Sequence, residues 1–118
     1  MSTPVGPYTP VLRAGDWVVC SGQLGLRDGS LVAGGVAAQL TVALDNLKAL
    51  LESTGATMAD VVKTTVFLTD IDDYAEMNDV YVEAFGDHRP ARSAIAVAAL
   101  PLGAVVEVEA WAHAPQPA

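Results

Sequence analysis

The chain has 118 residues, 52% of them hydrophobic, and its fourteen acidic and six basic residues give a formal net charge of −8. This length supports one domain with a real core and is too short for two, so we expect a single domain over residues 1–118. The acidic balance, with no cluster of Lys or Arg, argues against nucleic acid as a partner. The mean hydropathy of +0.36 is high for a domain of this size, and we expect part of the apolar surface to lie in subunit contacts.

No segment approaches the ~18 consecutive apolar residues of a membrane helix, and the first ten residues lack the basic and apolar regions of a secretory signal. We therefore expect a cytoplasmic protein without a membrane partner. The only cysteine, Cys20, lies in an apolar run and is predicted to be a buried core thiol rather than a nucleophile. The two histidines, His88 and His113, have no second ligand at a suitable spacing, so we expect no metal and no cofactor.

The first ten residues form a stiff extended arm, because they contain four helix breakers, Pro4, Gly6, Pro7 and Pro10. Tyr8 lies in this arm, and the local sequence favours packing of its ring over the alternative, a phenol at the rim of a site. Residues 11–13 and 17–21 are short β-type runs separated by a turn, which predicts a hairpin. Gly22 follows the second run and permits a bulge or a close approach of backbone to a ligand.

From Val36 the hydrophobic period becomes helical, with a stripe that consists of Leu40, Leu44, Leu47 and Leu51. Gly55 is suited to the end of this helix. Gln39 and Asn46 share one of its faces and are predicted to be surface or satisfied polar residues.

Residues 61–68 are rich in β-branched side chains and apolar on both faces, which predicts a central strand covered on both sides. Asp70 or Asp72 is suited to cap a second helix that Gly86 ends. The apolar stripe predicted for this helix comprises Ile71, Tyr74, Met77, Tyr81 and Phe85.

Residues 90–112 are predicted to form two apolar strands joined by a turn, and each strand carries one charge that an apolar strand does not explain. Arg92 in the first strand offers a planar, two-pronged donor suited to a carboxylate ligand, and Glu107 in the second supplies a complementary base. The alternatives are an ion pair of Arg92 with Glu107 or Glu109 at a sheet edge, or an arginine that extends its charge into water. This stretch alone slightly favours those alternatives, and Glu109 is expected to be solvated.

The order of elements is hairpin, helix, strand, helix and two strands. Two helices on one face of a mixed sheet of four to six strands is the economical packing of such a chain. The other sheet face then stays bare, which is a second argument for an oligomer.

A series of short motifs carries a resemblance over about residues 5–112: Gly6-Pro7-Tyr8, Ser21-Gly22-Gln23, Gln39 with Asn46, Val62-Lys63-Thr64-Thr65-Val66-Phe67, Asn78-x-x-Tyr81-x-x-x-Phe85, Pro90-Ala91-Arg92-Ser93 and Val106-Glu107-Val108-Glu109-Ala110. In this order and at these spacings they resemble the RidA/YjgF family. The resemblance implies a chorismate-mutase-like α+β fold. It also implies a homotrimer whose sheets form a central barrel with clefts between subunits.

For well-studied members, this resemblance implies hydrolysis of reactive 2-imino or enamine acids, such as 2-iminopropanoate and 2-iminobutanoate, to 2-oxo acids and ammonia. Pyridoxal-phosphate-dependent dehydratases release those substrates. Arg92 would then bind the substrate carboxylate and Glu107 would position or activate the water. Tyr8 completes the implied catalytic set and lines the cleft with Ser21, while Gly22 allows a close approach of the backbone.

Two positions depart from the pattern of that family. Position 94, in the implied substrate-binding set, is Ala94 where many members have Cys or Thr. Alanine is harmless there if the position acts through its backbone, and it alters substrate choice if the side chain matters. Thr9-Pro10 also replaces a common Ser-Gln pair.

Two other functions are weighed against the deaminase. One is a non-catalytic trimer that binds small carboxylates or a protein partner, against which stands the presence of both Arg92 and Glu107. The other is a ribonuclease, the weakest of the three, because the chain is acidic and has no paired histidines for acid–base work.

Overall fold

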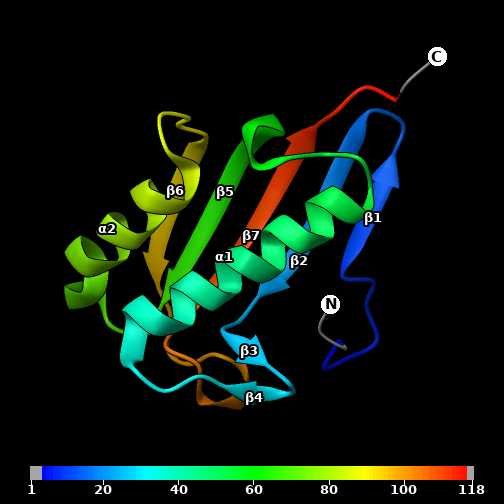
Figure 1. Cartoon of the computed structure of the whole chain (residues 1–118). Coiled ribbons are helices and arrows are strands. Elements are labelled where there is room, and N and C mark those ends of the chain that lie inside the picture. Colours follow the sequence, from blue (N-terminus) through cyan, green and yellow to red (C-terminus); the bar gives the residue numbers. More distant parts are fainter. Residues whose placement is uncertain (1–3, 117–118) are drawn as a thin grey trace.

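The structure is a computed structural model that describes residues 4–116 (Figure 1). Its main elements are β1 (Val11–Ala14), β2 (Trp17–Gln23), β3 (Leu26–Arg27), β4 (Ser30–Leu31), α1 (Gly35–Ser53), β5 (Val61–Leu68), α2 (Tyr74–Phe85), β6 (Ala91–Ala96) and β7 (Val106–His113). Short 3₁₀ helices cover Met58–Asp60, Ile71–Asp73 and Pro101–Gly103. None of the described helices is long and apolar enough to cross a membrane.

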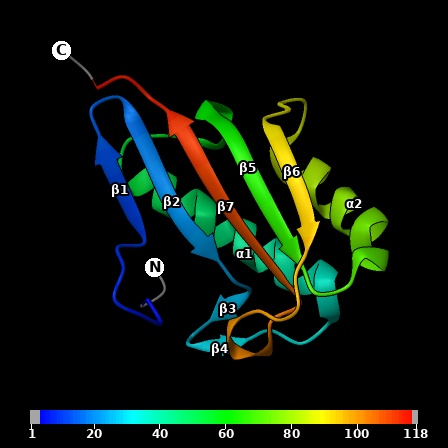
Figure 2. The ribbon, with the colours of Figure 1, turned by 180° about the vertical axis from the view of Figure 1, so that it is seen from behind.

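Five strands form one mixed sheet in the order β1-β2-β7-β5-β6. β6 runs parallel to β5, and all other neighbouring strands are antiparallel. Both helices lie on one face of this sheet (Figure 1), and the opposite face is uncovered when the molecule is seen from behind (Figure 2). The predicted α+β architecture, with a bare sheet face, is therefore confirmed.

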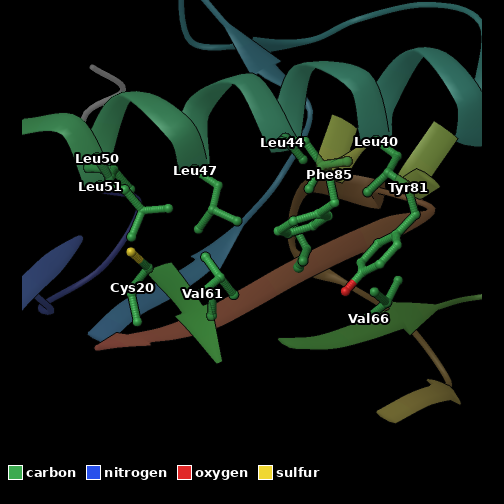
Figure 3. Close-up of a cluster of buried hydrophobic side chains, with 14 of the residues drawn as sticks. Cys20, Leu40, Leu44, Leu47, Leu50, Leu51, Val61, Val66, Tyr81 and Phe85 are labelled. Atoms are coloured by element: carbon green, nitrogen blue, oxygen red, sulfur yellow. The ribbon is translucent and has the colours of Figure 1, made fainter. Parts of the chain in front are cut away.

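The hairpin and the first helix follow the sequence prediction closely. The turn between β1 and β2 contains Gly15 with a φ of 60°, a conformation that glycine adopts without strain. The leucines of α1 point toward the sheet (Figure 3), and Leu40, Leu47 and Leu51 are fully buried. Cys20 of β2 lies in the same cluster. Burial raises the pKa of its thiol to about 11, so the predicted inert core thiol is confirmed.

The second helix begins later than its apolar pattern predicted. The Asp70 carboxylate accepts a hydrogen bond of 2.9 Å from the Asp72 N–H, as predicted for a cap, but it caps the 3₁₀ turn that precedes α2. Met77, Tyr81 and Phe85 are buried on the sheet. Ile71 and Tyr74 are 51% and 42% exposed, so their place in the core was predicted wrongly. The 3₁₀ helix has three residues per turn, which rotates Ile71 away from the buried face; Tyr74 is the first residue of α2 and is not covered by this reason.

The two C-terminal strands are not neighbours in the sheet. β5 lies between β6 and β7, and the connection between them contains the 3₁₀ helix Pro101–Gly103. The prediction that a simple turn joins them was therefore incomplete. β5 is central, as predicted, but it is covered on one face only, because alternate residues such as Thr65 and Phe67 face the bare side and are half-buried.

Gln39 and Asn46 of α1 hold the loops at one end of the sheet. The Gln39 Oε1 atom accepts a hydrogen bond of 3.0 Å from the Val105 N–H, directly before β7. Asn46 Nδ2 donates to the carbonyl oxygens of Leu24 and Leu26 at 3.3 and 2.9 Å. Both side chains are satisfied polar groups, as predicted, and they fix the position of the loops around the candidate site.

The bare sheet face carries large apolar side chains at its other end. Trp17 of β2 lies edge-on to Trp111 and to His113 of β7, with ring centroids 6.4 and 5.0 Å apart. Leu12 and Ile95 are also exposed on this face. Water-exposed aromatic and aliphatic surface of this kind marks an interaction face.

Candidate active site

A groove of about 360 Å³ gathers four of the six predicted site residues at one end of the bare face: Tyr8, Ser21, Gly22 and Glu107. They come from the N-terminal arm, from the end of β2 and from the start of β7. Val5, Leu24 and Pro101 add apolar walls, and Glu109 lines the groove beside Glu107. The chain thus places an acidic group and a phenol around one small, mostly apolar opening.

Ser21 holds the N-terminal arm against the sheet. Its hydroxyl donates a hydrogen bond of 2.7 Å to the Thr9 carbonyl, and its N–H donates to the Pro10 carbonyl at 2.9 Å. The Tyr8 phenol oxygen accepts a bond of 3.3 Å from the Val5 N–H. Tyr8 is 43% exposed and lines the groove, which matches the alternative of a phenol at a site rim and not the packing role that the local sequence favoured.

Gly22 makes room for the Glu107 carboxylate. The pairing of β2 with β7 is irregular between Cys20 and Gln23, which confirms a bulge around Gly22. A Cβ atom at position 22 would lie 1.8 Å from Oε2 of Glu107, far inside contact distance. The close approach predicted at Gly22 is therefore made by a side chain of the same protein, and any larger residue must displace the carboxylate.

Glu107 is held in conditions that favour its protonated form. Burial raises the pKa of this carboxyl, and the negative charge of Glu109 on the same face of β7 raises it further. A carboxyl whose pKa is shifted toward neutrality exchanges protons more readily near neutral pH than one at its ordinary value. Proton transfer is the chemistry that this environment supports.

Arg92 lies on the opposite face of the sheet from Glu107. In the register of the sheet Arg92 pairs with Thr64, and Glu107 pairs with Phe67. Thr64 is fully buried under α2, whereas Phe67 faces the bare side. Because side chains alternate between the faces of a strand, Arg92 points toward α2 and Glu107 points away from it. Neither ion pair considered for Arg92, with Glu107 or with Glu109, forms within residues 4–116.

Side chains of α2 surround the Arg92 guanidinium. Nη2 donates a hydrogen bond of 3.0 Å to the Tyr74 hydroxyl, and Nη1 lies 3.7 Å from the Met77 sulfur. The Cζ atom lies 4.8 Å from the centroid of the Tyr81 ring, at cation–π distance. Sequence reasoning placed these aromatic residues in a core stripe and missed this contact. The sequence signal that could have indicated it is the spacing of Tyr74 and Tyr81, which are seven residues apart and so lie on the same face of one helix.

Ala94 lies at the free edge of the sheet. The Val97 N–H donates to the Leu68 carbonyl at 2.7 Å, so alternate residues of β6 direct their backbone groups toward β5. By the same alternation, the N–H and C=O groups of Arg92, Ala94 and Ala96 point away from β5. The backbone of Ala94 is thus available to a partner even though its side chain offers no polar atom.

No group of three or more His, Cys, Asp or Glu side chains is arranged to hold a metal ion in the part of the chain that the structure describes.

The comparisons with known proteins agree with this fold. The family model described as Endoribonuclease L-PSP matches residues 1–114. The 2-iminobutanoate/2-iminopropanoate deaminase of Bos taurus is 44% identical over 110 residues, which cover 92% of this chain and 80% of the bovine protein.

Two solved structures share the whole fold. RidA from the Antarctic bacterium Psychrobacter sp. PAMC 21119 has a TM-score of 0.91 at 41% identity and covers 94% of this chain and 91% of its own. TdcF of E. coli, solved with bound serine, has a TM-score of 0.88 at 36% identity, with coverages of 93% and 90%. The chain belongs to the RidA/YjgF/L-PSP family, and the predicted resemblance is confirmed.

Proposed function

We propose that this protein hydrolyses small 2-imino acids, such as 2-iminopropanoate and 2-iminobutanoate, or their enamine tautomers, to 2-oxo acids and ammonia. The observation that carries the proposal is the presence of Arg92 and of the Glu107 groove in a chain 44% identical to a deaminase of that name. The substrate class follows from that relative and from the chemistry of these two groups.

The reaction adds one water to the C=N carbon and releases ammonia. Glu107, as a carboxylate, accepts a proton from the attacking water while the water oxygen bonds to the C=N carbon, and the resulting carboxylic acid gives that proton to nitrogen. This forms a carbinolamine, which carries one hydroxyl and one amino group on the same carbon. Glu107 then takes the hydroxyl proton and passes it to the amino nitrogen, so that the C–N bond breaks, ammonia leaves and the C=O bond forms. A positioned carboxylate contributes roughly 10²–10⁴-fold to such a step. The Tyr8 phenol lines the same groove, which supports a role for it in orienting the water or the leaving nitrogen.

Arg92 supplies the charge that a carboxylate substrate needs. Its guanidinium has no carboxylate within 4.0 Å among residues 4–116, so its charge is not neutralised within the chain. A bidentate pair of arginine and carboxylate is the strong, planar form of this contact. The TdcF structure contains serine, which also bears a carboxylate. The N–H of Ala94 lies at the same free edge and is suited to donate a further bond.

One copy of the chain does not form a complete site, because Arg92 and Glu107 lie on opposite faces of its sheet. We therefore infer a homotrimer in which Arg92 and Ala94 of one copy complete the groove of the next. A heterologous contact closes into a ring when the rotation that relates neighbouring copies closes, as a threefold rotation does. The exposed Trp17 and Trp111 give the bare face the apolar character that such an interface requires.

Two competing functions have less support. A binding module without catalysis does not require a carboxyl whose pKa is raised beside an apolar groove. Ribonuclease activity, which the family description names, calls for binding of a polyanion, and the net charge of −8 opposes this.

The cytoplasmic location stays a prediction, since one relative, mmf2 of Schizosaccharomyces pombe, is named as mitochondrial.

Replacing Arg92 tests carboxylate binding. We expect kcat/KM to fall at least about tenfold in both Arg92→Lys and Arg92→Ala, because a charge-assisted contact contributes roughly 1.5–3 kcal/mol and about 1.4 kcal/mol is a factor of ten. The assay follows imine decay by absorbance after a serine or threonine dehydratase. Arg27→Ala is the matched control, since Arg27 makes an exposed ion pair with Asp45. Wild-type activity in Arg92→Ala would remove the ligand role of Arg92.

Replacing the two glutamates separates the proton carrier from its neighbour. Glu107→Gln should depress kcat strongly, because the amide cannot take up the proton. Glu109→Gln should keep kcat at high pH but shift the acid limb of kcat/KM to lower pH. The reason is that the charge of Glu109 raises the pKa of Glu107, and the base form exists only above that pKa. Both variants are first shown to have the wild-type mass. An inactive Glu109→Gln with an active Glu107→Gln would reverse the assignment.

The assembly is tested by sedimentation equilibrium at micromolar concentration. We expect a mass three times the 12.2 kDa of the chain. Trp111→Glu, which places a charge on the bare face, should shift the protein toward the monomer. Val82→Glu on α2 is the control, because Val82 is about as exposed as Trp111 but lies on the helical side. A wild-type mass equal to one chain would contradict any site built between copies.

A further inference from the structure

Tyr74 is an exposed aromatic residue whose position packing does not explain. It is the first residue of α2, and its ring is 42% exposed although its spacing matches the buried stripe of that helix. Its hydroxyl accepts the hydrogen bond from Nη2 of Arg92 at 3.0 Å. The Arg92 Cζ atom also lies 5.5 Å from the centroid of the Tyr74 ring. Both of these contacts of the Tyr74 side chain are therefore with Arg92.

Tyr81 supplies a rigid surface beneath the same guanidinium. Its hydroxyl forms a buried hydrogen bond of 2.7 Å with Thr64, the residue that pairs with Arg92 across β5 and β6. Its ring packs on Phe85 with centroids 4.7 Å apart (Figure 3). Burial raises the pKa of the phenol, so it stays protonated and keeps this bond at neutral pH. The stacking partner of Arg92 is thus fixed by the core of the protein.

These contacts restrict the guanidinium in two ways. The Tyr81 ring lies beneath the guanidinium carbon and limits its movement toward α2, and the bond to Tyr74 fixes the direction of Nη2. A guanidinium carries five N–H donors, and among residues 4–116 only Nη1 and Nη2 of Arg92 have a hydrogen-bond partner, one each. Donors therefore remain for a carboxylate. An arginine side chain loses substantial rotamer freedom when it binds a ligand, and a group held in place beforehand loses less.

We propose that Tyr74 is a positioning residue for Arg92: its hydroxyl holds the guanidinium over the Tyr81 ring and so strengthens binding of a substrate carboxylate. This inference rests on the proposed role of Arg92. It assigns substrate affinity in part to a residue that lies at the start of α2, outside the groove of Glu107.

The test is a double-mutant cycle on ligand binding, which does not require turnover. The probe is 2-oxobutanoate, a product of the proposed reaction, titrated into the assembled protein by calorimetry. Tyr74→Phe removes one hydroxyl and leaves the ring, so we expect its Kd to rise about two- to tenfold, as for the loss of one ordinary hydrogen bond, because the hydroxyl acts on the ligand only through Arg92. KM should rise by a similar factor with little change in kcat. Val82→Ala, at another exposed position of α2, is the control and should bind as the wild type does.

The coupling between the two residues distinguishes positioning from a structural role. If Tyr74 acts through Arg92, then Tyr74→Phe has no further effect on Kd in an Arg92→Ala background. Equal effects in both backgrounds would overturn the proposal, and so would unchanged or tighter binding by Tyr74→Phe alone, which would make the hydroxyl a competitor of the ligand. Unchanged binding by Arg92→Ala would instead contradict the proposed function itself, so the two failures are distinct.

Discussion

The alternation of side chains along β5 determines where both halves of the candidate site lie. Thr64 faces α2 and pairs with Arg92 on one side, whereas Phe67 faces the bare side and pairs with Glu107 on the other. Residues an odd number of positions apart on a strand face opposite sides, as Thr64 and Phe67 do. The guanidinium and the carboxylate that pair with them are therefore separated by the thickness of the sheet. The proposed site shared between copies follows from this separation. So does the absence of an ion pair between Arg92 and a carboxylate among residues 4–116, where the guanidinium instead lies against side chains of α2.

Within one chain, this separation affects the pKa of Glu107 and the charge of Arg92. An arginine beside Glu107 in the same chain would stabilise the carboxylate and lower its pKa. In the observed arrangement the pKa of Glu107 is raised by burial and by Glu109, while Arg92 keeps its charge for a ligand. In the inferred trimer the substrate carboxylate binds the Arg92 guanidinium, and the carboxyl of Glu107 stays free to transfer the proton.

Much of the fold was predictable because its elements carry strong local signals. The leucine stripe of α1 and the β-branched run of β5 gave helix and strand at nearly their observed bounds. The order of strands was not predictable in the same way, because periodicity shows which residues share a face but not which strands pair. The sequence singled out Arg92 and Glu107 as candidate site residues, and their opposite faces become visible only once β5 is placed between β6 and β7. The contact of Gly22 with Glu107 crosses 85 positions of sequence, and no local pattern contains it.

The most direct test of the account is complementation between two inactive variants. Arg92→Ala and Glu107→Gln chains are unfolded together in equal amounts, refolded, and assayed for imine hydrolysis, with each variant refolded alone as the control. If every cleft takes Arg92 from one copy and Glu107 from the next, random mixing restores about one quarter of the clefts, because each required neighbour is present half of the time. We therefore predict recovery of about a quarter of the wild-type activity. Activity no higher than that of the separate variants, in mixed assemblies of the correct mass, would contradict a site shared between copies.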